Sequence, residues 1–327
     1  MSRLGASFVL ILSFSLTLMA GPKPGYKYYV VGNSSDVVRT TTPGTVLMGG
    51  GTDVDAAFQW MIGKAGGGDF VVIRVTGTDA YNPYIYGLGT VDSVETLIIT
   101  TVAGANDPFV ANKIRNAEAV WIAGGDQSDY INLWKGTQVA DAINYVANTK
   151  GAPVGGTSAG LAVLGQFIYS ALTGSVTSSQ ALANPFHSYI TLDRDFVSIP
   201  NMTGVFTDSH FVTRDRLGRL VAFLARVIKN GWATDVKGIG VDEQTAMLVN
   251  PDGSATRVGN GAVYFMRSNG QPQVCVSGTP LTYQNLAVYK VSGAATFNVA
   301  TWTGAGGTAY TVSANTGALS SSNGSIY

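Results

Sequence analysis

"VGGTSAGLAVLG", residues 154–165, places one serine between glycines directly after an apolar run. Within this stretch, residues 156–160 read G-x-S-x-G, with Ser158 at the centre. That spacing is typical of a sharp strand-to-helix turn that exposes a serine hydroxyl. The chain contains 41 glycines, so the pattern alone does not define a site. A function for Ser158 depends on whether the rest of the sequence supplies partners for it.

Apolar runs alternate with helical patterns over the first half of the chain. The expected strands are residues 45–53, 69–77, 94–101, 117–126 and 151–158. The expected helices are residues 56–64, 108–116, 138–148 and 158–170. Strands that are apolar on both faces and alternate with helices predict an α/β fold with a mostly parallel sheet.

Glycine-rich turns follow four of these strands and read "MGGGTD", "RVTGTD", "IAGGDQ" and "GGTSAG". In a parallel sheet these strand ends lie at one edge, where α/β proteins carry their sites. Further strands are expected at residues 205–211, 237–250 and 261–266, and an amphipathic helix at residues 214–231. We therefore expect the four turns to line one cleft.

A serine nucleophile needs a general base within hydrogen-bond reach. The chain has two histidines, His187 in an expected loop and His210 at the end of an expected strand on the same sheet edge. His210 is the candidate base. An α/β-hydrolase has its catalytic histidine late in the chain, after the serine and the acid. No histidine follows residue 210 here, and this argues against that fold.

Four segments occur in a characteristic order: "GGDQ" at 124–127, "GGTSAG" at 155–160, "TDSHFVTRDRLGR" at 207–219 and "GIGVDEQTA" at 238–246. Together they resemble the cyanophycinase branch of the serine peptidases that also include dipeptidase E, over about residues 45–249. The resemblance implies a flavodoxin-like three-layer α/β sandwich related to class I glutamine amidotransferases. It also implies that Ser158 is the nucleophile and His210 the general base.

The same resemblance implies substrate-binding roles for Gln127, Asp208, Arg214 and Arg216. For Arg219 an ion pair and a substrate contact both stay open. The glutamine that precedes the histidine in cyanophycinases is Ser209 here, which departs from the pattern that goes with cyanophycin as substrate.

The third member of the triad is less clearly marked. The family has an acidic residue between the serine and the histidine, and the counterpart expected here is Gln180. A glutamine oxygen accepts an imidazole N–H bond without supplying a charge. Asp193, Asp195 and Glu243 stay open as alternatives.

The expected oxyanion hole uses backbone amides of Gly125 and Ala159, which stand beside the nucleophile. No metal or other cofactor is expected. No histidine, cysteine or carboxylate cluster has zinc-ligand spacing, and "MGGG" lacks the fingerprint of a dinucleotide site. An amidotransferase would use a cysteine at the elbow, whereas Cys275 lies far from it.

Composition restricts the partners and the compartment. Of 327 residues only 12% are charged, with a net charge of zero, so neither nucleic acid nor an anionic membrane is an expected partner. Arg3 followed by the apolar segment 8–19 and Ala20 predicts a secretory signal peptide at residues 1–20. An uncleaved membrane anchor stays open. The expected localisation is secreted or periplasmic.

The expected organisation is a catalytic domain at residues 21–277 and a β-rich extension or tail at 278–327, where charged residues nearly vanish. The expected function is a secreted serine-type peptidase that hydrolyses peptide or isopeptide bonds near aspartyl residues, in a peptide or an Asp-containing polymer. The alternative is a catalytically weak or inactive binding protein on the same scaffold. A homodimer is left open.

Overall fold

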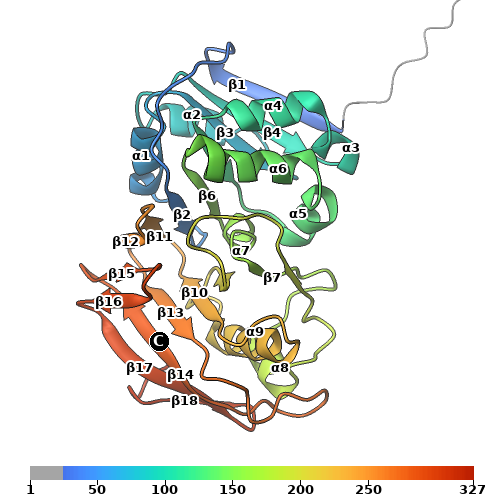
Figure 1. Cartoon of the computed structure of the whole chain (residues 1–327), viewed down its shortest axis with the longest axis vertical. Helices are drawn as coiled ribbons and strands as arrows, with labels where there is room; N and C mark the ends of the chain where they lie inside the picture. The colour runs from blue at the N-terminus through green and yellow to red at the C-terminus, as the bar shows by residue number, and fades with distance from the viewer. Residues whose placement is uncertain (1–24) are drawn as a thin grey trace, which may run out of the picture.

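Two β-sheets carry the strands of an elongated molecule; the parallel strands of the first occupy one half, while its far end, β15 (Thr296–Asn298) and β16 (Thr303–Ala305), lies in the other half beside the second sheet (Figure 1). The computed structural model describes residues 25–327. The predicted signal peptide lies outside these residues and stays a prediction. Within the described part, no helix is both long and apolar enough to cross a membrane.

The first sheet contains the parallel strands expected from the sequence. Its order is β1-β4-β3-β5-β6-β2-β11-β12-β15-β16, and the five strands from β4 to β2 run parallel. The strands are β1 Tyr26–Gly32, β2 Thr45–Met48, β3 Asp69–Arg74, β4 Ser93–Ile99, β5 Ala119–Ile122, β6 Val154–Thr157, β11 Thr245–Val249, β12 Ser254–Gly259, β15 Thr296–Asn298 and β16 Thr303–Ala305.

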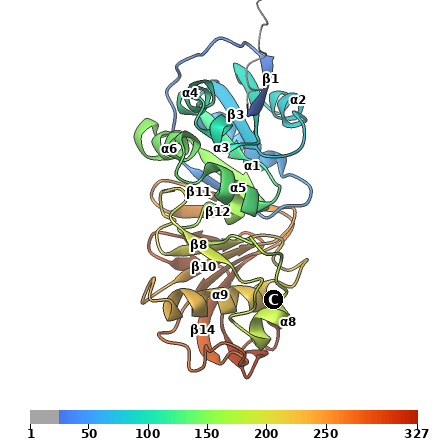
Figure 2. The ribbon, with the colours of Figure 1, turned by 90° about the vertical axis from the view of Figure 1, so that its right-hand side faces the viewer.

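Helices cover both faces of the parallel strands (Figure 2). On one face, Phe58 of α1 packs with Phe70 of β3 and Trp121 of β5. On the other face, Ile114 of α4 and Ile143 of α6 share a core with the opposite side chains of the same strands. These helices are α1 Asp55–Lys64, α2 Tyr81–Tyr86, α3 Val102–Ala105, α4 Pro108–Asn116, α5 Gln127–Trp134, α6 Gln138–Tyr145 and the π-helical turn η1 Val146–Lys150.

The second sheet is mostly antiparallel and has the order β18-β17-β14-β13-β10-β9-β7-β8. Helices α8 and α9 pack beside it, and α9 buries an apolar face against it (Figure 1). Its elements are β7 Phe167–Tyr169, α8 Ser178–Ala183, β8 Leu192–Arg194, β9 Val205–Asp208, α9 Leu217–Lys229, β10 Lys237–Val241, β13 Val263–Arg267, β14 Tyr283–Val291, β17 Thr308–Asn315 and β18 Ala318–Ser321.

The division into two sheets differs from the sequence expectation at His210. Strand β9, which precedes His210, pairs with β10 in the second sheet, whereas β6, which precedes Ser158, lies in the first. The segment 237–250 is likewise divided between β10 of the second sheet and β11 of the first. Apolar runs reveal strands but carry no information about which sheet each strand joins.

The helix expected after Ser158 is also different. Helix α7, Ala159–Ala162, is a single turn, and the chain then enters β7. Residues 159–165 are buried throughout, so no polar face marks the helical period in this run. Gly165 lies so close to the Val205 carbonyl that a Cβ there would be 2.8 Å from its oxygen. The sharp turn at this glycine lets β7 pair with β9.

The segment after residue 277 is β-rich, as expected, and it extends both sheets: β15 and β16 join the edge of the first, and β14, β17 and β18 join the second. Strand β13 pairs along its length with residues 287–291 of β14, and β17 pairs in turn with β14. The Tyr327 hydroxyl accepts a bond from the Leu217 amide at the start of α9. This segment is therefore continuous with the sheet that carries His210.

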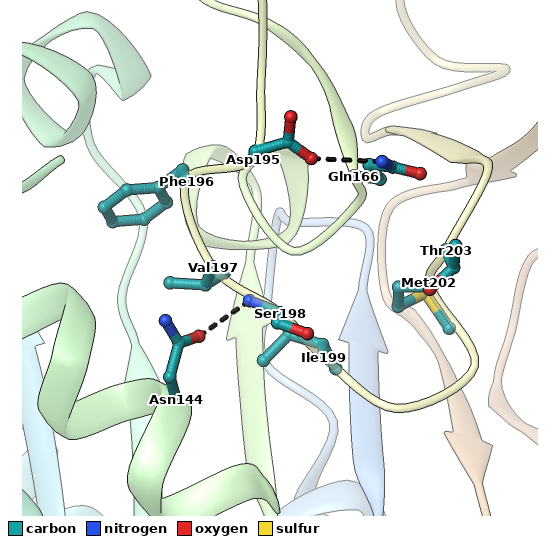
Figure 3. A pocket seen from close by; sticks show the side chains of 9 residues that line it. All are labelled: Asn144, Gln166, Asp195, Phe196, Val197, Ser198, Ile199, Met202 and Thr203. Atoms are coloured by element: carbon teal, nitrogen blue, oxygen red, sulfur yellow. Dashed lines mark hydrogen bonds between the residues drawn. The ribbon is translucent and has the colours of Figure 1, made fainter. Parts of the chain in front are cut away.

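The loop between β8 and β9 is tied to both halves of the molecule (Figure 3). The Ser198 amide donates to the Asn144 side chain of α6, and the Gln166 amide group donates to Asp195. A small cavity of about 160 Å³ lies under this loop. These bonds fix the path of the chain into β9.

Gly160→Ala is expected to destabilise the protein by about 1–3 kcal/mol, because an added Cβ would lie 2.0 Å from the Ile122 carbonyl oxygen. Gly63→Ala, inside α1 where a Cβ meets nothing within 4 Å, is the matched control and is expected to stabilise by up to about 1 kcal/mol. Urea unfolding of both variants measures the two changes. Equal stabilities would contradict the close packing at Gly160.

Candidate active site

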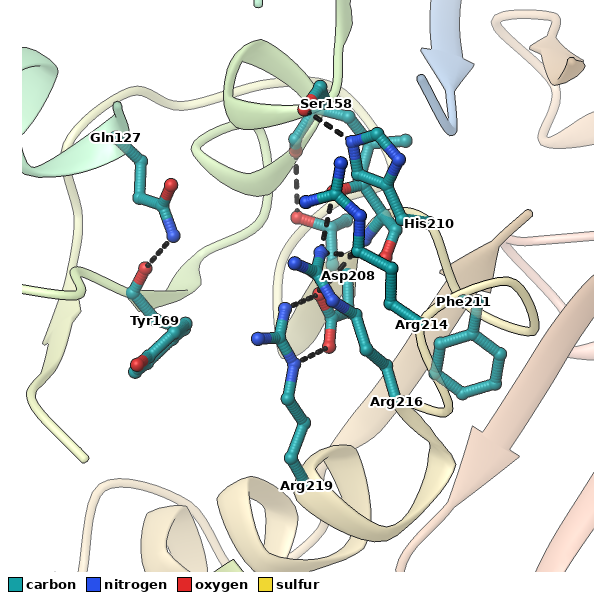
Figure 4. A network of polar contacts seen from close by, with 12 residues as sticks. Gln127, Ser158, Tyr169, Asp208, His210, Phe211, Arg214, Arg216 and Arg219 are labelled. Atoms are coloured by element: carbon teal, nitrogen blue, oxygen red, sulfur yellow. Dashed lines mark hydrogen bonds and ion pairs between the residues drawn. The ribbon is translucent and has the colours of Figure 1, made fainter. Parts of the chain in front are cut away.

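Ser158 stands at a strained turn between β6 and α7 (Figure 4). Its backbone has φ 54° and ψ −113°, a combination that non-glycine residues rarely adopt. Glycines on both sides make the turn sterically possible, since a Cβ at Gly156 would lie 2.6 Å from the Gly160 carbonyl carbon. Backbone strain of this kind at a serine is a feature of nucleophile elbows.

His210 reaches Ser158 from the second sheet. Its Nε2 lies 2.7 Å from the Ser158 Oγ, and the histidine is 5% exposed. The imidazole packs against Gly50, where a Cβ would lie 2.4 Å from its Cε1. His210 itself has φ 47°, so both residues of the pair are held in sparsely populated backbone conformations.

Glu243 completes the arrangement on the far side of the imidazole. Its Oε1 lies 2.5 Å from the His210 Nδ1. With Nδ1–H donating to this carboxylate, Nε2 is free to accept the Ser158 O–H. Glu243 lies in the short turn that links β10 to β11, where the two sheets meet.

Three consecutive carbonyls at the end of β2 hold this group together. Met48 accepts the Ser158 amide at 3.1 Å, and Gly49 accepts the His210 amide at 2.8 Å. Gly50 accepts the amide of Gln244, the residue after Glu243, at 2.8 Å. The "MGGG" turn therefore places all three side chains, although they come from two sheets.

Gln180 does not take the third position that the resemblance implied. Its side chain accepts the Thr177 amide and forms the capping box of α8. Asp193 pairs with Lys135, and Asp195 accepts from Gln166, so neither faces His210. Glu243 replaces Gln180 as the partner of the histidine. One sequence signal could have identified Glu243: it comes shortly after a strand, β10, that pairs in parallel with β9, the strand that precedes His210.

The pKa of His210 is lowered from its usual value. Burial of the ring disfavours the imidazolium, and the neighbouring Arg214 and Arg216 add to this effect. The hydrogen bond to Glu243 opposes it. The imidazole is therefore neutral at neutral pH, the state that accepts a proton from serine.

A pocket of about 240 Å³ opens beside Ser158. It is lined by residues from both halves of the molecule, among them Gly125, Gln127, Ala159, Asp208, Arg214, Arg216 and Arg219. Gly124 lies next to Ser158, since a Cβ added at Gly124 would be 3.5 Å from the Ser158 Cβ. The pocket thus contains every oxyanion and substrate-binding residue expected from the sequence.

The three arginines of the pocket have different surroundings (Figure 4). Arg219 is buried and donates to both carboxylate oxygens of Asp208, at 2.8 and 2.5 Å. Arg216 donates to the Ser209 carbonyl, and burial lowers its pKa to about 10. The Arg214 side chain is 55% exposed and lies 3.8 Å from Glu243. Arg214 therefore has the most freedom to meet a ligand.

Asp208 and Gln127 are more constrained than expected. Asp208 is 2% exposed, and Arg219 occupies both of its oxygens, so its direct role is to neutralise the arginines. Gln127, at the start of α5, donates to the Tyr169 carbonyl at 3.3 Å. This bond ties α5 to β7 across the pocket.

A strained serine at the end of a parallel strand, with a histidine and a carboxylate in line beside it, is an arrangement that recurs in serine peptidases. The family model of peptidase family S51 matches residues 88–256. The chain belongs to this family.

Cyanophycinases are among the similar proteins. That of Trichormus variabilis is 27% identical over 206 residues, which are 62% of this chain and 63% of the relative. That of Synechococcus elongatus is 26% identical over 215 residues, 64% of this chain and 62% of the relative. The match thus spans less than two thirds of these relatives.

Among solved structures, a peptidase from an acI-B1 Actinobacterium superposes with a TM-score of 0.50 at 17% identity. The match covers 73% of this chain and 98% of that one. This likeness concerns the fold.

The charges around His210 predict opposite pKa changes in two variants. Glu243→Gln removes the carboxylate that favours the imidazolium, so the pKa of His210 is expected to fall further. Arg214→Gln removes a cation, so that pKa is expected to rise. NMR titration of the imidazole signals measures both, and His187, which lies outside the pocket lining, supplies an internal control. Shifts in the same direction would contradict this electrostatic account.

Proposed function

We propose that the protein is a serine-type peptidase that hydrolyses peptide or isopeptide bonds with Ser158 as nucleophile. The observation that carries the proposal is the continuous contact from Ser158 Oγ through His210 to Glu243. A nucleophile, a base in hydrogen-bond reach and a group that orients the base are the parts that acyl transfer requires.

The reaction proceeds in two halves. His210 Nε2 takes the Ser158 proton as Oγ attacks the carbonyl carbon, and the Gly125 and Ala159 amides stabilise the resulting oxyanion. His210 then gives this proton to the leaving amine as the C–N bond breaks. Water, deprotonated by His210, hydrolyses the acyl-enzyme and regenerates Ser158. Glu243 positions the imidazole and stabilises its charged form throughout.

Substrates with a carboxylate on the acyl side of the scissile bond suit the pocket beside Ser158. Asp208 pairs with Arg219 and lies 3.6 Å from Arg216, and Glu243 lies 3.8 Å from Arg214. Two carboxylates therefore face three guanidinium groups, which leaves one positive charge at the pocket. Guanidinium groups bind carboxylates in a bidentate fashion. Ser209 receives a bond from Arg216 instead of presenting a glutamine to the pocket, so Asp-containing peptides are better first substrates than cyanophycin.

Ser158→Ala and His210→Ala are each expected to remove most peptidase activity, and the double variant little more, because the residues act as a unit. Glu243→Gln is expected to lower kcat roughly 10³- to 10⁴-fold, since the imidazolium loses its counter-charge. His187→Ala is the matched control. Because the His210 pKa is lowered from its usual 6.5, the midpoint of the acid decline in kcat/KM should lie below pH 6.5. Full activity of either alanine variant would contradict the mechanism.

Arg214→Gln is expected to lower kcat/KM about 10- to 100-fold on a peptide with Asp on the acyl side, and to leave its Asn analogue nearly unchanged. Rates are compared at pH 8, where His210 is neutral in both proteins, and Arg115→Gln on the exposed side of α4 controls for the lost charge. An unchanged ratio of kcat/KM between the Asp and Asn peptides would show that Arg214 does not bind the substrate carboxylate.

A further inference from the structure

A second and larger hollow, of about 500 Å³, lies at the carboxyl ends of β2 and β3. One wall runs from the segment after β2 to the first residue of α1, and the other consists of the last residue of β3, Ala80 and the helix α2. We call it the β2–β3 groove. The residues that matter for its chemistry are Gly51, Asp53, Asp55, Arg74, Tyr81 and Tyr84. None of these residues takes part in the chemistry at Ser158.

The β2–β3 groove begins on the histidine side of the site. Gly50 packs against the His210 ring, and a Cβ at Gly51 would lie 3.1 Å from the Glu243 Cβ. Gly51 is also the first residue of the groove wall. The pocket of about 240 Å³ described above, by contrast, is lined by Ser158, Gly125 and Ala159. The β2–β3 groove thus adjoins Glu243, whereas the other pocket contains Ser158 itself and extends along Ser209 and Arg214 toward His210 and Glu243.

The proton transfer from His210 determines which part of a bound substrate lies beside the imidazole. The leaving amine receives its proton from His210 Nε2, so this amine and the residue that carries it must depart beside the imidazole. A carboxylate-binding pocket on the serine side holds the acyl portion. The β2–β3 groove is then the hollow available to the leaving portion.

The groove walls have the chemistry of a cation site. Asp53 and Asp55 face it with two tyrosines, and the Tyr84 hydroxyl donates to Asp55 at 2.6 Å. Arg74 balances one carboxylate, and its guanidinium is held by the carbonyls of Thr76 and Thr78. One negative charge therefore remains beside Tyr81 and Tyr84, and the Arg74 guanidinium, which lies 5.7 Å from the centre of the Tyr81 ring, shows that a cation fits against this wall.

Asp53 is the carboxylate that would gain most from a bound cation. Burial raises its pKa, and Arg74 only partly offsets this effect. An arriving ammonium or guanidinium group would compensate the desolvated charge, as buried carboxylates require.

We propose that the β2–β3 groove binds the leaving-group residue of the substrate and selects a cationic side chain there. This assignment rests on the proposed function, because a leaving group exists only if Ser158 is acylated. The chain would then cleave most readily between an acidic residue on the acyl side and a basic residue on the amine side.

The test uses peptides that share one acyl portion and differ in the leaving residue, which is arginine, its neutral isostere citrulline, or glutamate. Wild-type protein is expected to cleave the arginine peptide about 3- to 30-fold faster than the citrulline peptide in kcat/KM, and the glutamate peptide slowest. Asp53→Asn and Asp55→Asn are expected to bring the arginine-to-citrulline ratio toward one. Asp141→Asn, an equal charge change on the exposed side of α6, should leave the ratio intact.

An activated nitrophenyl ester of the same acyl portion separates the possible failures, because it has no leaving residue to bind. The groove variants are expected to hydrolyse this ester at the wild-type rate. Ester hydrolysis with equal rates on arginine and citrulline peptides would overturn the groove assignment alone. If the wild-type protein cleaves neither the ester nor any peptide, this result contradicts the proposed peptidase function and, with it, the assignment of the groove to the leaving group.

Discussion

The site depends on the hydrogen bonds at the end of strand β2. Successive carbonyls of Met48, Gly49 and Gly50 accept the amides of Ser158, His210 and Gln244. These bonds join a strand end of the first sheet, a strand end of the second sheet and the turn between them. Backbone bonds of this kind fix positions more firmly than flexible side chains can, so one short strand sets the spacing of serine, histidine and glutamate. Glycines are needed here because a Cβ at Gly49 would lie 1.9 Å from the Asp242 carbonyl oxygen.

The same junction places unlike charges on either side of the serine–histidine pair. The segment from the end of β9 into α9 supplies Arg214, Arg216 and the buried Asp208–Arg219 ion pair, while the segment from β2 into α1 supplies Asp53 and Asp55. The net charge of the chain is zero, so its electrostatic character is local. Burial and the nearby arginines favour the neutral form of His210, whereas the hydrogen bond to Glu243 favours the charged form.

Much of this arrangement was predictable from sequence, and what was missed has physical reasons. The G-x-S-x-G turn and the apolar runs predicted a strand end at Ser158 and the parallel strands around it. Sheet membership was not predictable, because Val205–Asp208 has the same buried pattern as the first-sheet strands. Gln180 was expected at a position that Glu243 occupies, since chain order does not show which turn faces the imidazole. The α8 capping box, Thr177 with Gln180 three residues later, is a sequence signature that marks Gln180 as a helix-start residue.

The central claim is that His210 and Glu243 make Ser158 a nucleophile, and covalent labelling with a fluorophosphonate tests it most directly. Intact-mass analysis followed by peptide mapping should find one probe per wild-type chain, attached to Ser158. His210→Ala should label far more slowly while keeping a wild-type circular-dichroism spectrum. A folded wild-type protein that stays unlabelled, or that carries the probe on another residue, would contradict the account.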